Sequence, residues 1–256
     1  MSRIGDTFRE LQKTGRKALI PYLMAGDPSL DATRALVADM ESAGADIIEL
    51  GVPFSDPLAD GPTIQQAAER SLKKGTTLRR VLSLVEKIRG HSEIPLILMT
   101  YYNPVFKYGL EPFVKDSVRA GVDGVIIPDL IPDEASDFMA MAKRHGLDTI
   151  FLLAPTSTEE RIIRVTRASS GFIYYVSITG ITGSQISMGN SMKDTLRSIK
   201  EHAHIPVAVG FGISTPEEAS TVAKLADGVI IGSAIVKLIA QGKNIKGFIK
   251  NIRKAI

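Results

Sequence analysis

The feature that most constrains the fold is a series of eight short apolar runs, separated by polar stretches with helical spacing. Within each run the apolar residues are continuous instead of alternating with polar ones. Continuous runs are typical of parallel strands that are buried on both faces of a sheet. We therefore predict strands at Ala18–Met24, Ile47–Val52, Ile94–Met99, Gly124–Ile127, Thr149–Leu153, Phe172–Val176, Pro206–Val209 and Gly228–Ile231.

The stretches between the runs carry helix signals. In the segment Leu30–Ala43 apolar residues recur every three or four positions, with Asp31 as the predicted N-cap and Gly44 as the predicted stop. Further helices are predicted after Thr158 and from Pro216, which brings a proline and two acids into a first turn. Strands and helices thus alternate along the chain, which indicates an α/β protein.

The number of strand–helix units favours a closed (β/α)8 TIM barrel, which typically takes roughly 250 residues. An open doubly wound sheet is the alternative, because the same alternation would produce it. Extra helices are predicted at both ends, at Ser2–Lys13 and Ile245–Ile256, and two more within Pro62–Gly90. No linker or low-complexity stretch divides the chain, so we expect one domain over residues 1–256.

Composition excludes several classes of protein. The chain has no cysteine, which rules out a disulfide scaffold, a thiolate zinc site and a cysteine nucleophile. Its net charge is only +3 and its basic residues form no stripe interleaved with aromatics, so we expect no nucleic-acid binding. No apolar run reaches the roughly 20 residues of a membrane span, and the first residues lack a signal-peptide core. We expect a soluble, cytoplasmic protein.

Carboxylates after the second run are the first candidates for chemistry. Glu49 interrupts an apolar strand near its end, where a charged group is costly unless it is paired or functional. Asp56 and Asp60 follow in a loop rich in proline and glycine. A strand-end carboxylate with a loop carboxylate predicts an acid–base pair. The alternative is structural, with Glu49 bonded to a backbone group or an arginine and one aspartate capping the next helix.

Two glycine turns, Gly210–Ser214 and Gly232–Ala234, follow the seventh and eighth runs. Barrels bind phosphate there, because glycines admit the anion to the backbone and a helix N-terminus offers free N–H groups. Two plain tight turns are the alternative. The segment Ser177–Asn190, rich in Gly, Ser and Thr, is predicted to be a lid or a plain surface loop.

Missing patterns narrow the reaction further. The four histidines form no metal-ligand pattern, and no lysine lies at a strand end, as a Schiff-base aldolase would need. No nucleophile elbow or Walker loop occurs. What remains is carboxylate acid–base chemistry on a phosphorylated small molecule, without a metal.

The chain also resembles the tryptophan synthase α subunit family over nearly its whole length. The most specific match is Leu50–Gln65, which reads LGVPFSDPLADGPTIQ. The chain departs from the family at Ile131, where proline is frequent, and at Ser184-Gln185, where arginine is frequent. Further segments that match are Pro21-Tyr22, Tyr101–Pro104, Pro128–Leu130, Thr179–Gly183, Gly210–Ile213 and Gly232–Ala234.

The resemblance implies a lyase of tryptophan biosynthesis, which cleaves indole-3-glycerol phosphate to indole and glyceraldehyde 3-phosphate. It implies that Glu49 protonates the indole ring at C3 and that Asp60 accepts a hydrogen bond from the indole N–H. Thr182 would contact Asp60 when the loop closes. The substrate-binding residues that it implies are Tyr22, Met99 and Tyr174 for the ring, and Gly183, Gly210, Phe211, Gly212, Gly232 and Ser233 around the phosphate.

The resemblance further implies a partner, a PLP-dependent β subunit in an α2β2 heterotetramer, with no cofactor in this chain. Two other functions stay open. One is another phosphate-binding barrel enzyme, such as a sugar-phosphate isomerase, which would lack the Glu49–Asp60 segment. The other is a non-catalytic barrel that only activates a partner β subunit.

Overall fold

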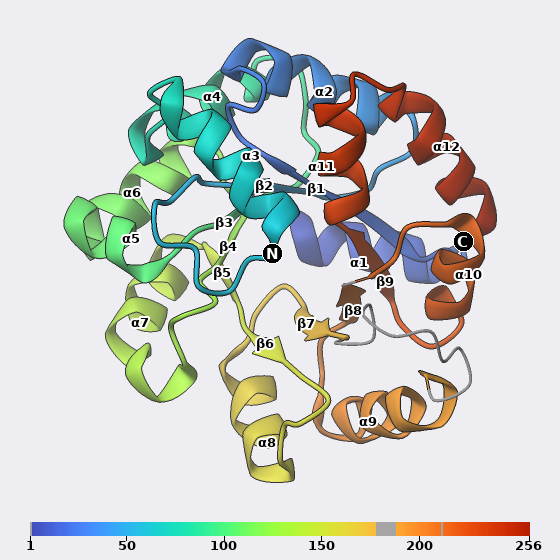
Figure 1. Cartoon of the computed structure of the whole chain (residues 1–256). Helices are drawn as coiled ribbons and strands as arrows, with labels where there is room; N and C mark the ends of the chain where they lie inside the picture. The colour runs from blue at the N-terminus through green and yellow to red at the C-terminus, as the bar shows by residue number, and fades with distance from the viewer. Residues whose placement is uncertain (1, 178–187, 211) are drawn as a thin grey trace.

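The computed structural model describes residues 2–177, 188–210 and 212–256, and within them one parallel sheet curls into a barrel (Figure 1). Each predicted strand is present, with ends that differ by at most two residues from those expected. The strands are β1 Ala18–Met24, β2 Ile48–Gly51, β3 Leu96–Met99, β4 Gly124–Ile126, β5 Asp148–Ile150, β6 Leu152–Leu153, β7 Ile173–Val176, β8 Val207–Gly210 and β9 Gly228–Ile231.

The order of the strands closes the barrel. The sheet runs β5-β4-β3-β2-β1-β9-β8-β7-β6, and its two edge strands, β5 and β6, are separated only by Phe151. The predicted fifth strand is therefore split into β5 and β6, and through it the sheet returns to its own start. The TIM barrel is confirmed, and the open doubly wound sheet is not observed.

Helices surround the strands, as Figure 1 shows in a view down the barrel. One expectation was wrong: Ser29, not Asp31, is the N-cap of α2, because its side chain accepts a hydrogen bond from the Ala32 N–H. Asp31 lies in the first turn, where a negative charge also favours the helix dipole. The helices are α1 Arg3–Lys13, α2 Leu30–Ser42, α3 Pro62–Lys73, α4 Leu78–Arg89, α5 Tyr102–Tyr108, α6 Leu110–Ala120, the 3₁₀ turn η1 Pro132–Glu134, α7 Ser136–His145, α8 Glu159–Ala168, α9 Met188–His202, α10 Pro216–Ala223, α11 Ser233–Ala240 and α12 Ile245–Ala255.

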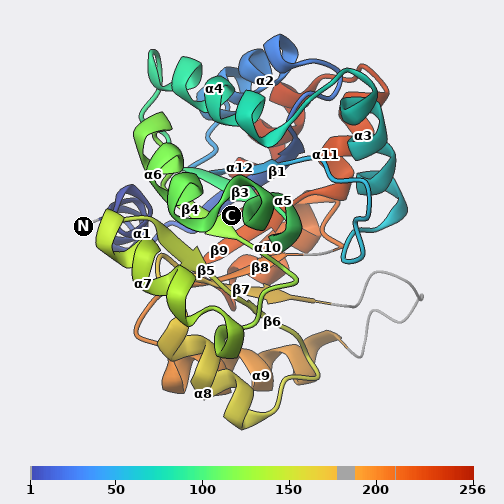
Figure 2. The ribbon, with the colours of Figure 1, turned by 90° about the vertical axis from the view of Figure 1, so that its left-hand side faces the viewer.

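The core has two layers, which explains the continuous apolar runs. In β1, Leu19 and Leu23 join the cluster between the strands and the outer helices, whereas Ile20 joins the cluster inside the barrel. Side chains of α1, among them Ile4 and Phe8, complete the inner cluster. Figure 2 shows α1 at one end of the barrel, with α3 and α11 at the other. Both faces of each strand are buried, so neither face needs polar residues.

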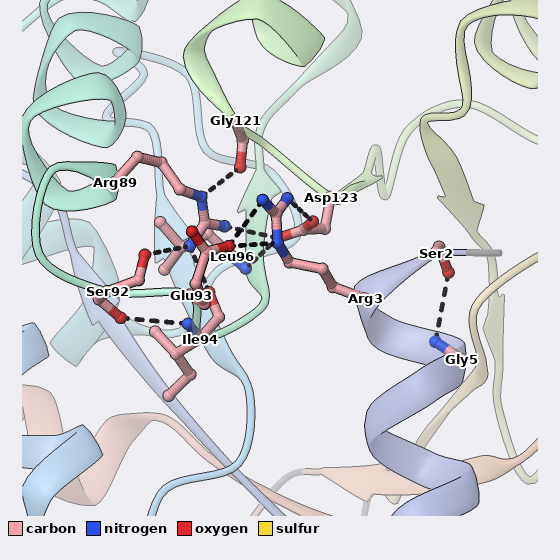
Figure 3. Close-up of polar contacts among 10 residues, drawn as sticks. All are labelled: Ser2, Arg3, Gly5, Arg89, Ser92, Glu93, Ile94, Leu96, Gly121 and Asp123. Atoms are coloured by element: carbon pink, nitrogen blue, oxygen red, sulfur yellow. Dashed lines mark hydrogen bonds and ion pairs between the residues drawn. The ribbon is translucent and has the colours of Figure 1, made fainter.

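At the end of the barrel near α1, aspartates that precede strands accept hydrogen bonds from backbone N–H groups of neighbouring strands and from arginines. Asp123, just before β4, accepts hydrogen bonds from the Leu96 N–H at 2.8 Å, from Arg89 at 2.6 Å and from Arg3 at 3.0 Å (Figure 3). Asp46 accepts in the same way from the Leu19 N–H and from Arg253. These contacts satisfy strand N–H groups that would otherwise lack partners. Because the strands are parallel, their carboxyl ends all lie at the opposite end, where barrels carry their chemistry.

No helix in the described part of the chain is long and apolar enough to cross a membrane.

Candidate active site

Glu49 lies in β2 with its side chain inside the barrel, and it is 1% exposed. Both of its carboxylate oxygens are buried without a hydrogen-bond partner among the described residues. Burial, together with the nearby charge of Asp60, raises the pKa of Glu49 to about 8. The structural alternative, a Glu49 bonded to a backbone group or an arginine, is therefore not what the structure shows. A carboxyl group in this state holds a proton at neutral pH and can donate it.

Asp60 is half-buried in the loop between β2 and α3. Burial raises its pKa, while a hydrogen bond from the Tyr101 hydroxyl lowers it. Neither Asp60 nor Asp56 caps α3, whose N-cap is Gly61 and which has no side-chain cap hydrogen bond. Asp56 is exposed and accepts a hydrogen bond from Ser55, so only Asp60 is paired electrostatically with Glu49.

The three residues predicted to form a ring slot come together. Tyr22 and Tyr174 are 5% and 8% exposed, and the half-buried Met99 packs against the clusters that contain each of them. Burial, followed by the charges of Asp60 and Glu49, raises the pKa of both tyrosines well above the usual value. The tyrosines therefore pack in the core and also face the two carboxyl groups.

The two tyrosine rings pack directly against glycines, where a larger residue would clash with them. A Cβ on Gly51 would overlap the Tyr22 hydroxyl, and a Cβ on Gly210 would lie 2.6 Å from the Tyr174 hydroxyl. The sequence reasoning missed Gly51, because nothing local shows that Tyr22 from another strand approaches it. It assigned Gly210 to substrate binding, and the structure adds a packing reason for a glycine there.

The turns after β8 and β9 differ in what their helices offer an anion. The first turn of α10 is already satisfied by a capping box, in which the Thr215 side chain accepts from the Glu218 N–H and the Glu218 carboxylate accepts from the Thr215 N–H. The first turn of α11 has no side-chain cap at Gly232. The start of α11 is therefore more open to an anion than the start of α10, whose first turn is capped.

Other predicted substrate-binding positions are only partly described. Gly212 lies in the turn before α10 with a φ of 74°, a conformation that favours glycine. Thr182, Gly183 and Phe211 lie outside the described residues. The last three residues of the segment predicted as a loop, Met188–Asn190, belong to helix α9, and residues 178–187 lie outside the described residues. Within the described ranges, no group of three His, Asp or Glu side chains is placed to hold a metal ion.

Tyr101 was not singled out as a site residue from sequence, although it lies in a segment that matches the family. Its side chain is 5% exposed, and its hydroxyl accepts a hydrogen bond from the Ala59 N–H at 3.0 Å. Its ring packs 5.4 Å from that of Phe54, between centroids. The signal that could have found it is its place at the end of β3, next to the strand that carries Glu49.

Comparisons with known proteins agree with this arrangement. A family model described as "Tryptophan synthase alpha chain" matches residues 8–255. A tryptophan synthase alpha chain of Geotalea uraniireducens is 56% identical over 94% of this chain and 90% of the relative, and one of Geobacter sulfurreducens is 52% identical over 100% and 99%. A crystal structure of tryptophan synthase subunit alpha from Legionella pneumophila superposes with a TM-score of 0.92 at 38% identity, covering 100% of this chain and 98% of that one.

Proposed function

The chain belongs to the tryptophan synthase alpha chain family, and we propose that Glu49 and Asp60 carry out its lyase reaction, the retro-aldol cleavage of indole-3-glycerol phosphate to indole and glyceraldehyde 3-phosphate. The observation that carries this assignment is the buried, unpartnered carboxyl group of Glu49, with its pKa near 8. A proton donor is what the reaction needs first, because indole is a poor carbon leaving group until C3 is protonated.

In the proposed mechanism, Glu49 donates its proton to C3 of the indole ring, and positive charge develops on the ring nitrogen. The resulting carboxylate takes the proton of the hydroxyl group on the adjoining carbon of the glycerol chain. The bond between that carbon and C3 then breaks, its electron pair returns to the ring, and the carbon becomes the aldehyde. Glu49 ends protonated, so the proton count balances.

Asp60 is proposed to act through charge. An ionised Asp60 accepts a hydrogen bond from the indole N–H and stabilises the positive charge that develops there. Glu49 and Asp60 thus need opposite protonation states, and their surroundings favour this difference. Glu49 has no hydrogen-bond donor among the described residues, whereas Asp60 has the Tyr101 hydroxyl.

For substrate binding, we propose that Tyr22, Met99 and Tyr174 hold the ring, and that the uncapped start of α11 at Gly232 and Ser233 holds the phosphate. Gly183, Gly210, Phe211 and Gly212 are proposed to line the same end of the substrate, and Thr182 to contact Asp60. These roles rest on the family resemblance, with added support at Gly212 from its left-handed backbone.

The partner proposed is the family's PLP-dependent β subunit, in an α2β2 assembly. The large apolar side chains that are exposed include Leu58, Phe106 and Ile131, at 93%, 63% and 36%. They follow β2, β3 and β4, which are adjacent strands, so they lie at the same end of the barrel as Glu49. An apolar surface beside the mouth of the site suits a partner that receives indole.

Two further parts of the proposal concern the chain as a whole. We propose that residues 1–256 form one domain, which is supported by the pairing of β1 with β9 and by Arg253, which bonds the Lys17 carbonyl and Asp46. We also place the enzyme in the cytoplasm, since a phosphorylated substrate does not cross membranes freely.

The test is an assay of purified chain with indole-3-glycerol phosphate, with and without a β subunit. Release of indole by the isolated chain, and its loss in Glu49→Gln, supports the proposal. Isomerisation of a sugar phosphate without indole release would favour the alternative barrel enzyme. Activation of a β subunit without any turnover would favour a non-catalytic role.

A further inference from the structure

Two segments that match the family, Tyr101–Pro104 and Pro128–Leu130, contribute only the Tyr101 hydroxyl to the mechanism above, and they meet in the structure. The Tyr102 N–H donates a hydrogen bond to the Asp129 Oδ1 at 2.8 Å, across 27 residues of sequence. Tyr102 is the first residue of α5, and Tyr101, at its N-cap, supplies no side-chain cap. Asp129 therefore caps α5 from the loop after β4 and fixes the backbone on which Tyr101 stands.

The Tyr101 side chain reaches from that backbone into the loop that carries Asp60. Its hydroxyl accepts the Ala59 N–H at 3.0 Å, which leaves the hydroxyl's own proton to be donated. Asp60 follows Ala59 directly in the chain, and the Tyr101 hydroxyl lowers the pKa of its carboxylate, as a hydrogen-bond donor does. The ring is buried against Phe54, so the hydroxyl has little freedom to leave this position.

We propose that Tyr101 is a positioning residue for the lyase reaction, which holds the Asp60 carboxylate toward the indole N–H and is itself held in place by Asp129. This inference rests on the role proposed for Asp60. The contacts connect three loops, those after β2, β3 and β4, into one support for a single carboxylate.

The chemistry of the contact fits this role. Burial and the charge of Asp60 raise the pKa of Tyr101, so the hydroxyl stays protonated and keeps a proton to donate while it accepts the Ala59 N–H. A hydrogen bond to a carboxylate stabilises the ionised form, and here it opposes the burial that raises the pKa of Asp60. Tyr101 thus favours both the orientation and the ionised form of Asp60, which are the two properties that its proposed role requires.

The test compares Tyr101→Phe with Tyr108→Phe in full-length protein. Both variants keep the ring and lose a hydroxyl that bonds an aspartate, but the Tyr108 hydroxyl bonds Asp116 on α6, outside the site. In Tyr101→Phe we expect kcat for indole release to fall about 10–100-fold, as for loss of a hydrogen bond to a charged group. KM should change much less, because the phosphate contacts remain. Tyr108→Phe should keep normal kcat.

The pH profile separates positioning from a structural role. Without the Tyr101 hydroxyl, the pKa of Asp60 rises, so the acidic limb of kcat/KM should move to higher pH. The alkaline limb, which belongs to Glu49, should stay. Asp129→Ala should lower kcat in the same direction, and Asp129→Asn should restore it, because the amide oxygen can still accept the Tyr102 N–H.

Opposite outcomes overturn the inference. It fails if Tyr101→Phe matches Tyr108→Phe in kcat, or if its rate falls only together with Tm while the acidic limb stays in place. Asp60→Asn distinguishes the two levels of the proposal. Normal turnover in Tyr101→Phe beside an inactive Asp60→Asn overturns the positioning role alone, whereas normal turnover in Asp60→Asn overturns the role of Asp60 and with it that of Tyr101.

Discussion

The Tyr22 hydroxyl occupies the space into which any side chain on Gly51 would extend. The two residues lie on adjacent strands, β1 and β2, and Tyr22 is the direct partner of Glu49 in the register. Gly51 thus decides where Tyr22 lies, and Tyr22 in turn forms one wall of the space beside Glu49.

This relationship predicts the effect of Gly51→Ala. The new methyl group would push the buried Tyr22 ring from its place, and overpacking of this kind costs about 1–3 kcal/mol. We expect a lower Tm and weaker binding of an indole-containing ligand, measured by calorimetry. Gly61→Ala, where an added Cβ meets nothing within 4 Å, is the control and should keep its Tm. Unchanged binding and Tm in Gly51→Ala would contradict the proposed slot.

The second prediction concerns Glu49 as proton donor. Glu49→Gln keeps the volume and removes the acid, so turnover should fall at least about 10²–10⁴-fold while binding of substrate analogues survives. In the unmodified enzyme, activity should also decline as pH rises through about 8, because Glu49 must be protonated to act. Steady-state rates across pH measure both effects. Near-normal turnover in Glu49→Gln would remove Glu49 from the mechanism.

The same buried acid has a consequence for stability. The pKa of Glu49 is higher in the folded protein than in the unfolded chain, so folding loses stability as pH rises from its ordinary value toward about 8. Glu49→Gln cannot ionise and avoids this loss. We expect the variant to be more stable than the parent by roughly 1–4 kcal/mol at pH 7 and nearly equal near pH 4.5. Urea unfolding at several pH values tests this, and a difference that does not change with pH would speak against the raised pKa.

The fourth prediction tests the phosphate site at α11. A Cβ on Gly232 would have room, with its nearest neighbour, a Tyr22 carbon, at 3.6 Å, and the backbone there is not left-handed. Gly232→Ala should therefore fold with nearly unchanged Tm but raise KM strongly, because the methyl group blocks close approach of the anion. Weakened protection by glycerol phosphate in thermal melts is the readout. If the variant instead unfolds, or binds glycerol phosphate normally, the assignment is wrong.

The fifth prediction concerns the end of the barrel away from the site. Asp123 and Arg89 are both nearly buried, so Asp123→Ala leaves a buried guanidinium without its carboxylate and should cost about 3–5 kcal/mol. The Arg3 side chain is 44% exposed, so Arg3→Ala should lower the free energy of unfolding by only about 0–1 kcal/mol. Denaturant unfolding measures the difference. Activity per folded molecule should be unchanged in both variants. Equal losses of unfolding free energy in the two variants would show that the buried ion pair stabilises the fold no more than the exposed one.

Several features of the candidate site were predictable because their signals are local. Glu49 was predicted from a charged residue inside an apolar run, and the turn at Gly232 from a glycine that precedes a helix. The capping box at Thr215 and Glu218, which distinguishes the start of α10 from that of α11, also has a local signal in the spacing of these two residues. Asp31 was mistaken for an N-cap because Ser29, two residues earlier, is an equally good candidate, and only the backbone direction decides between them.

The sequence by itself determined a parallel sheet buried on both faces, because the eight strand–helix units have continuous apolar runs, and their number favoured a barrel. An open doubly wound sheet would satisfy the same alternation, so the structure decided that the sheet closes on itself. The tertiary structure alone decided that Glu49 has no partner among the described residues, that Tyr22 needs Gly51, and that Tyr101 connects Asp129 with Asp60. The physical reason is that each of these depends on which residues from different strand ends come within contact distance. A protonated acid and an oriented carboxylate are set by desolvation and by hydrogen bonds across loops, and neither is recorded in the spacing of residues along the chain.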